Sequence, residues 1–191
     1  TKVNAVSSNG TELNSETDNT IMKVNLLKPL APGDSVVIDL DFETYFDKET
    51  IRNRMKLFYN ELDNTIKHYD IVHWYPRIAV YDRKFGWDTQ QHMDHEFYGE
   101  FGSFHVEMTL PNNFIIDGTG ELINENEVLP KDLRAKLDVS NFKSNWNKVP
   151  SVVIASDGSK KTWKYSAMNV HDVAYTTDPS YRIGEVRWKG I

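Results

Sequence analysis

Short runs in which apolar and polar residues alternate most limit how this chain can fold. The clearest run is Ser103–Leu110, in which every second residue is apolar. Successive side chains of a β-strand point to opposite faces, so this pattern gives one apolar face and one polar face. A helix would need apolar residues three or four positions apart. The pattern therefore predicts a strand with one buried face, ended by a turn at Pro111-Asn112-Asn113.

The same alternation predicts a hairpin nearer the N-terminus. Met22, Val24 and Leu26 share one face, turn-forming residues follow at Lys28–Asp34, and alternation returns over Val36–Glu43. We expect these two runs to pair as antiparallel strands.

A second hairpin is predicted in the C-terminal third. Val152–Ile154 is followed by the turn signal Asp157-Gly158-Ser159 and by alternation over Thr162–Ala167. One segment, Pro130–Leu137, predicts a short helix, since it carries Asp132 near its start and two leucines one helical turn apart.

These patterns predict an all-β fold. Roughly eight to ten short strands, about ten residues apart and without alternating strand–helix units, indicate an antiparallel arrangement. We expect a saddle-shaped sheet or β-sandwich with one short helix. The 191 residues suit one domain. Residues 20–191 are expected to form it, and 1–19 to be a weakly ordered or edge-strand segment. The charged, aperiodic stretch Thr44–Asp70 predicts no more than a short strand near Met55–Tyr59, and its role stays open.

Composition excludes several functions. The formal net charge of −6 and the lack of a basic stripe argue against nucleic-acid binding, which depends on clustered Lys and Arg. No cysteine is present, so disulfides, thiolate metal sites and cysteine nucleophiles are excluded. No apolar run is long enough to predict a membrane segment. The chain begins with Thr1 and not with Met, which suggests an expressed fragment or a processed product.

One cluster invites a metal-site interpretation. His92-Met93-Asp94-His95-Glu96 places two imidazoles and two carboxylates within five residues. Zinc peptidases instead carry His-Glu-x-x-His on a helix, with the general base between the two histidines. The order here is different and no helical apolar stripe surrounds it, so a polar loop is favoured. We predict no catalytic residue, metal ligand or cofactor-binding residue in this chain.

Aromatic residues gather between Trp74 and Phe104, and two interpretations remain open. They could form a platform for sugars or peptides, or they could serve core packing and a face toward another domain. The candidates for an interdomain or cleft face are Trp74, Tyr75, Arg77, Trp87 and Tyr98. Arg77 is included because its planar guanidinium could bind a carboxylate within the protein or on a neighbouring domain.

Two stretches carry a family resemblance. Trp74–Leu122 holds a Tyr-Pro element, a strand ending in proline and the Gly-Glu-Leu turn of Gly118–Leu122, and Asn169–Pro179 is the second landmark. Together they resemble the amino-terminal β-domain of bacterial aminopeptidase N-type zinc metallopeptidases, the gluzincin family of hydrolases. The resemblance covers the chain from about Thr20 onward.

This resemblance implies a fold and a role. In that family the domain is a mostly antiparallel, saddle-shaped β-structure that packs on a thermolysin-like catalytic domain and helps to enclose the substrate cleft. The implied partners are the protein's own C-terminal catalytic domain and, in the parent protein, a peptide substrate. Zinc is expected in that catalytic domain, and the implied location is periplasmic or exported.

The motifs of catalysis are missing from the sequence. It contains neither His-Glu-x-x-His nor the Gly-x-Met-Glu-Asn substrate loop, so the chain is expected to be inactive alone and to hold no cofactor. Family members can supply a Gln from this domain to hold the substrate's amino terminus. Just upstream of Pro76 this chain has His73 and no Gln, so this role is assigned to no residue. The alternative is an independent β-sandwich module that binds glycans or peptides.

Overall fold

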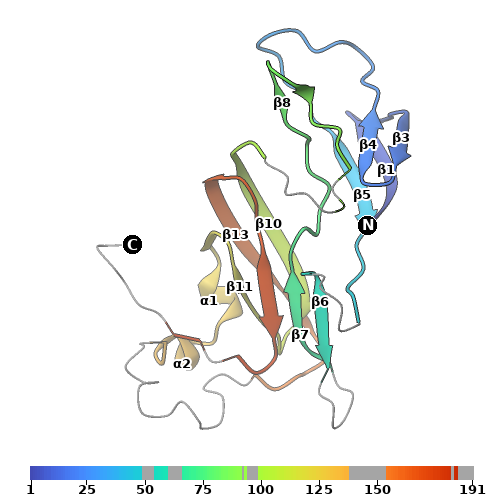
Figure 1. The fold of residues 1–191 in the computed structure, drawn as a ribbon. Coiled ribbons are helices and arrows are strands. Elements are labelled where there is room, and N and C mark those ends of the chain that lie inside the picture. Colours follow the sequence, from blue (N-terminus) through green and yellow to red (C-terminus); the bar gives the residue numbers. More distant parts are fainter. Residues whose placement is uncertain are drawn as a thin grey trace. The chain divides into compact units, whose positions relative to one another are not determined.

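The computed structural model describes residues 1–48, 54–59, 66–91, 93, 99–137, 154–181 and 183–184. Strands account for 45% of the structure and helices for 5%, and all pairs of named strands are antiparallel (Figure 1). The predicted all-β, antiparallel class is confirmed.

The chain divides into two compact units, which we describe separately. Unit 1 consists of Thr1–Tyr45 and His73–Glu100, and unit 2 consists of Phe46–Val72 and Phe101–Ile191. Each unit is therefore built from two stretches of chain. The segment expected to be weakly ordered or an edge strand, residues 1–19, contributes three strands to unit 1.

The described residues of unit 1 form three small sheets. β1 (Lys2–Ser8) lies between β2 (Thr11–Glu12) and β5 (Asp39–Glu43). β3 (Ser15–Asp18) pairs with β4 (Ile21–Val24), and β8 (Tyr81–Asp82) pairs with β9 (Gly86–Trp87).

The hairpin predicted between residues 22–26 and 36–43 is wrong. β4 pairs with β3, whereas β5 pairs with β1. Only Asn19 and Thr20 separate β3 from β4, and Asn19 adopts the left-handed conformation that tight turns require (φ 51°). A two-residue connection orders fewer residues than the long loop 25–38 would, so the local pairing is favoured.

Unit 2 holds two larger sheets. In the first, β13 (Lys160–Val170) lies between β10 (Gly102–Pro111) and β12 (Glu121–Leu122). In the second, the order is β11 (Ile115–Gly118), β14 (Tyr175–Asp178), β7 (Ile66–Ile71) and β6 (Lys56–Tyr59). β10 confirms the strand predicted over Ser103–Leu110.

Two other predictions for this unit were only partly correct. The stretch Thr44–Asp70 supplies both β6 and most of β7, of which only a strand near β6 was predicted. Ile154 belongs to no strand, and β13 pairs with β10 and β12 instead of forming the predicted local hairpin. Val152 and Val153 lie outside the described residues.

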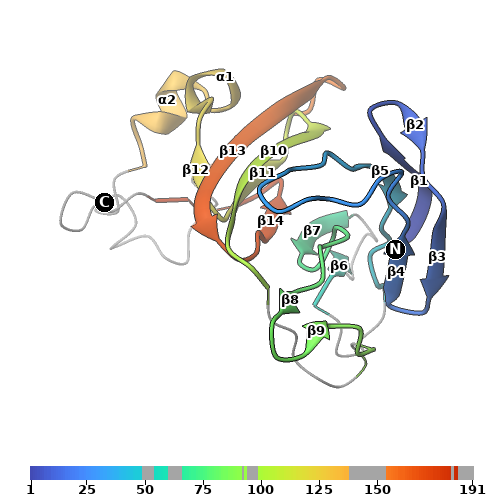
Figure 2. The ribbon, with the colours of Figure 1, turned by 90° about the horizontal axis from the view of Figure 1, so that it is seen from above.

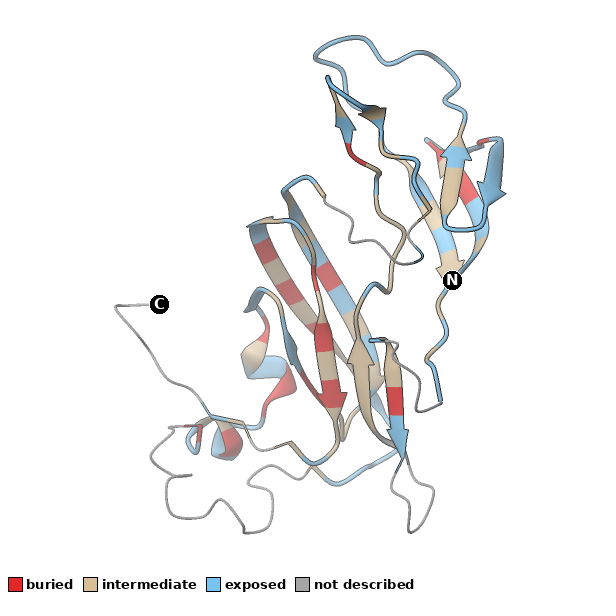
Figure 3. Ribbon diagram, viewed as in Figure 1, coloured by how far each residue is buried: buried red, intermediate tan, exposed pale blue. Residues whose placement is uncertain are grey.

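Buried residues of unit 2 gather on β13, β14 and β11 (Figure 3). Trp163, Tyr165 and Ala167 are buried, as their alternation predicts. Two four-residue helices, α1 (Glu125–Val128) and α2 (Lys131–Arg134), follow β12 and lie beside it in Figure 2. α2 lies within the predicted helix, whereas α1 was not predicted.

The segment Gly118-Thr119-Gly120 makes a tight bend. The Thr119 amide donates to the Ala174 carbonyl at 3.0 Å, and the Ala174 amide donates to Thr119 Oγ1 at 3.1 Å. A Cβ on Gly118 would lie 2.2 Å from the Ala174 oxygen, so only glycine fits. Gly120 has φ +100°, a conformation that other residues rarely adopt. The bend thus joins the β11–β12 corner to the start of β14.

Candidate functional site

The predicted interdomain face is only partly brought together. The rings of Trp74 and Tyr75 meet edge to face with centroids 5.0 Å apart, and Thr44 Oγ1 donates to the Trp74 carbonyl at 2.7 Å. Both aromatic side chains are half-buried. They therefore contribute to packing within unit 1.

Arg77 and Trp87 lie in different surroundings. A Cβ on Gly99 would come within 1.9 Å of Arg77 Nη2, so the guanidinium lies directly against the Gly99 backbone. Trp87 is 58% exposed and meets Tyr81, which was not among the candidates, at a centroid distance of 5.1 Å. Tyr98, the fifth candidate, lies outside the described residues.

The metal-like cluster cannot be placed in the structure. His92, His95 and their two acidic neighbours lie outside the described residues, and of this segment only Met93 is described. Elsewhere in the described ranges, no three His, Asp or Glu side chains gather as a metal site would require.

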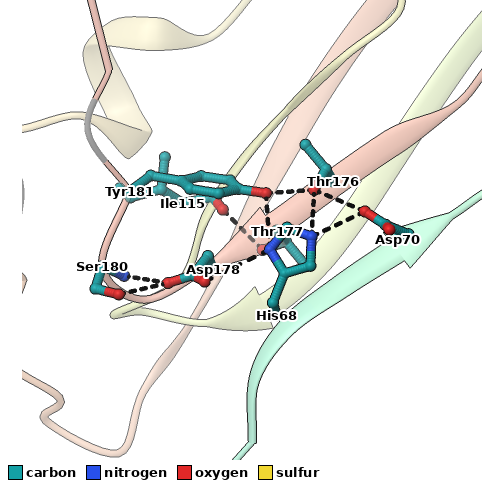
Figure 4. A network of polar contacts seen from close by, with 8 residues as sticks. All are labelled: His68, Asp70, Ile115, Thr176, Thr177, Asp178, Ser180 and Tyr181. Carbon is teal, nitrogen blue, oxygen red and sulfur yellow. Dashed lines mark hydrogen bonds and ion pairs between the residues drawn. The ribbon is translucent and has the colours of Figure 1, made fainter. Parts of the chain in front are cut away.

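A polar network that the sequence did not predict lies on β7 and β14 (Figure 4). Asp70 and Thr176 are cross-strand partners. His68 and Asp178 each lie two residues away from one of them, so the alternation of a strand places all four side chains on one face. Tyr181, just after β14, completes the network.

His68 is at the centre of this network. Its Nε2 lies 2.8 Å from Asp70 Oδ1 and 3.3 Å from Thr176 Oγ1. Its Nδ1 lies 3.2 Å from the Tyr181 hydroxyl and 3.5 Å from Asp178 Oδ2. Both ring nitrogens are therefore engaged, and each has a carboxylate nearby.

The remaining contacts connect the network to the corner after β14. Thr176 Oγ1 donates to Asp70 Oδ1 at 3.3 Å and is also in close contact with the Tyr181 hydroxyl. Asp178 Oδ1 accepts from the backbone amide and the hydroxyl of Ser180, both at 2.7 Å. The chain direction after β14 is thus fixed by side chains that β7 and β14 present.

Burial changes the acidity of the phenol in the network. Burial of Tyr181 raises its pKa to about 12, and the negative charges of Asp178 and Asp70 add to this, although the hydrogen bond with Thr176 acts in the opposite direction. The phenol therefore stays neutral at ordinary pH. The side chains of His68 and Asp178 are 27% and 14% exposed, so solvent reaches the network only in part.

The hydrogen bonds oppose a catalytic role for Thr176. A carboxylate only accepts, so the Nε2 proton of His68 is directed to Asp70. Nε2 then has no free lone pair with which to accept the Thr176 hydroxyl proton. The network therefore connects β7, β14 and Tyr181 through polar contacts and has a structural role. Its sequence signals were the pairs His68-x-Asp70 and Thr176-x-Asp178, which fit one face of each strand.

Unit 1 presents a second candidate, an apolar surface. Its buried apolar residues, among those that the structure describes, are Val6, Leu13 and Val80. Many more large apolar side chains of this unit are exposed: Leu26, Leu27, Leu30, Val36, Val37, Tyr45, Ile78, Tyr81, Phe85, Trp87 and Met93. Exposed apolar residues point to a binding site where they lie side by side, as Tyr81 and Trp87 do.

The β8–β9 hairpin holds part of this surface in a fixed shape. Asp82 Oδ1 accepts from the amides of Lys84 and Phe85 at 2.8 and 2.6 Å, which closes the turn. Gly86 follows with φ +74°. Tyr81 and Trp87 meet across the hairpin and Phe85 is 72% exposed at its tip, so three aromatic rings are presented to solvent.

Comparison with known protein families, curated proteins and solved structures finds no significant match to this chain. In the parts of the chain that the structure describes, no helix has the length and apolar character of a membrane span.

Proposed function

We propose that this chain is a non-catalytic β-domain of a zinc aminopeptidase-like metallopeptidase, which docks on the catalytic domain of that protein and helps to shape its substrate cleft. Zinc and the catalytic residues belong to the catalytic domain in this proposal. The 191-residue chain is then inactive alone, since its sequence holds no His-Glu-x-x-His motif.

The observation that carries the proposal is the exposed apolar surface of unit 1. Ile78, Phe85 and Trp87 are 81%, 72% and 58% exposed, and they fall in the segment Trp74–Leu122 that carries the family resemblance. Covering such side chains with a second domain would remove them from water, which is the main favourable contribution to association. Aromatic residues are also the most frequent anchors of protein interfaces.

A docking experiment tests the proposal. The chain, titrated into the zinc peptidase domain of its parent protein, is expected to bind it. Trp87→Ala and Phe85→Ala should each weaken binding about tenfold or more, the usual effect of removing an aromatic anchor. Met168→Ala is the matched control, because Met168 is an exposed apolar residue of unit 2 (66%). Equal losses in all three variants would contradict docking through unit 1.

The second candidate is an independent glycan- or peptide-binding module. It is favoured by the Tyr81–Trp87 pair, because two exposed rings held on a closed hairpin offer a rigid face on which a sugar could stack. Glycan-array binding by the 191-residue chain, abolished by Trp87→Ala, would support this candidate over domain docking.

A further inference from the structure

β10 is a long strand at the edge of its sheet. It has ten residues, and in the order β10-β13-β12 one of its edges pairs with β13. No strand in the described part of the chain pairs with the other edge (Figure 1). A free edge carries a row of backbone donors and acceptors that can pair with a further strand.

Hydrogen bonds of β13 show which backbone groups face this free edge. The Lys164 amide donates to Asn124 Oδ1 at 3.0 Å, and the Lys164 carbonyl accepts from the Ile123 amide at 2.9 Å. Both groups of Lys164 therefore point away from β10. Because this direction alternates along a strand, the groups of Trp163 and Tyr165 point toward β10.

Trp163 and Tyr165 lie opposite Met108 and Val106 of β10. These even-numbered residues direct their amides and carbonyls to β13, so the odd-numbered residues direct theirs to the free edge. The outward amides are those of His105, Glu107 and Thr109. Pro111, the next odd position, has no amide to offer, as expected of a strand edge.

An antiparallel second copy of β10 could bind this edge in a few registers, because each outward residue must face another outward residue. Centring the pair on His105 or on Glu107 would place a side chain opposite its own copy, and for Glu107 the two carboxylates would repel. Centring it on Val106 places His105 opposite Glu107 twice. That register also brings Phe104 opposite Met108 on the other face of the strand.

We propose that two copies of this chain associate through their β10 strands, antiparallel about a two-fold axis at Val106. The two sheets then continue as one across the axis. The interface combines the outward backbone hydrogen bonds with contacts between the His105 imidazole and the Glu107 carboxylate, both exposed in the single chain. This proposal is independent of the proposed function.

The usual protection of a sheet edge is found only at the two ends of β10. Proteins protect sheet edges with bulges, prolines and charged side chains. In β10 the irregularity is confined to Gly102–Phe104 and the proline to the last position. Between them His105 and Glu107 lie symmetrically about Val106, so each imidazole meets a carboxylate of the second copy in this register.

The mass of the 191-residue chain at low and high concentration tests the proposal. We expect 22.1 kDa at low concentration and twice that mass at high concentration. His105→Glu places two carboxylates opposite each other and should weaken the dimer about tenfold or more, whereas adding Glu107→Lys to it should restore association. Met168→Glu, an equal charge change on β13, should have no effect. A mass of 22.1 kDa at every concentration would overturn the proposal.

Amide hydrogen exchange distinguishes this dimer from any other. The amides of His105, Glu107 and Thr109 should exchange slowly at high concentration and rapidly at low concentration. The amides of Val106 and Met108, bonded to β13, should be slow in both. A dimer in which the first set stays rapid refutes the proposal, and so does a monomer in which that set is already slow.

Discussion

At the scale of single residues, His68 and Tyr181 explain how β14 ends. Imidazole, two carboxylates, a threonine and a phenol satisfy one another, and each partner lies on β7, on β14 or at the corner that follows. A partly buried network of this kind stabilises a structure when all members are paired and destabilises it when one is removed. The network therefore stabilises unit 2.

Tyr181 gives a pH-dependent prediction. Its phenol should ionise near pH 12 in the folded chain but near its ordinary value of 10.0 when unfolded. Since the folded state holds this proton more tightly, the contribution to stability is complete below pH 10 and is lost as the pH rises through 12. The difference in tyrosinate absorbance between the wild type and Tyr181→Phe should have its midpoint near 12. A midpoint near 10 would show that the phenol is not buried in the network.

Asp178 gives a prediction about stability. Asp178→Asn keeps one oxygen that can accept from Ser180 but replaces the charged oxygen that faces His68 with an NH2 group, so the free energy of unfolding should fall by about 1–2 kcal/mol. Asp157→Asn is the matched control, because Asp157 closes a similar turn with Ser159 on the surface and faces no imidazole. Urea unfolding of both variants should show the larger loss at Asp178. Equal losses would mean that the turn, not the network, accounts for the effect.

At the scale of secondary-structure elements, the strand glycines Gly118 and Gly102 should differ in how much stability is lost when each is replaced by alanine. Gly118→Ala should cost about 3 kcal/mol or more, because the added Cβ meets the Ala174 oxygen at 2.2 Å. Gly102→Ala, at the start of β10, meets nothing closer than a ring atom of Phe104 at 3.9 Å and should change stability by less than about 1 kcal/mol. Thermal unfolding of the two variants checks this order, and similar losses would contradict the bend described here.

At the same scale, sequence patterns predicted individual strands better than they predicted which strands pair. The alternation of Ser103–Leu110 and of Thr162–Ala167 was sufficient for β10 and β13, because each has one buried face and burial determines the period. Pairing was harder to predict. β5 joins β1 and β13 joins β10, since the partner of a strand depends on loop closure and distant packing, which a local pattern does not contain.

The residues of the candidate site were harder to predict from the sequence than the pairing of the strands. Trp74, Tyr75, Arg77 and Trp87 were identified as aromatic or charged residues, but their separation into packed and exposed positions depends on tertiary structure. The network of His68, Asp70, Thr176 and Asp178 joins positions more than a hundred residues apart. Each strand alone shows only a polar face, which is the ordinary pattern of solvent exposure.

At the scale of the whole chain, the two units differ in how completely they bury apolar residues. Unit 2 encloses Trp163, Tyr165 and their neighbours, whereas the described part of unit 1 buries few large apolar side chains and exposes many more. A unit of that kind gains stability when a partner covers it. Unit 1 should therefore unfold at a higher temperature in a chain extended past Ile191 to include the proposed catalytic domain. An unchanged temperature would argue against contact between them.

Zinc content and aminopeptidase activity, compared between the 191-residue chain and the extended chain, test the central proposal most directly. We expect the 191-residue chain to bind no stoichiometric zinc and to release no product from an aminoacyl anilide, while the extended chain gains both. Stoichiometric zinc in the 191-residue chain, lost on changing His92 and His95 to Ala, would contradict the proposal. So would an extended chain with neither zinc nor activity.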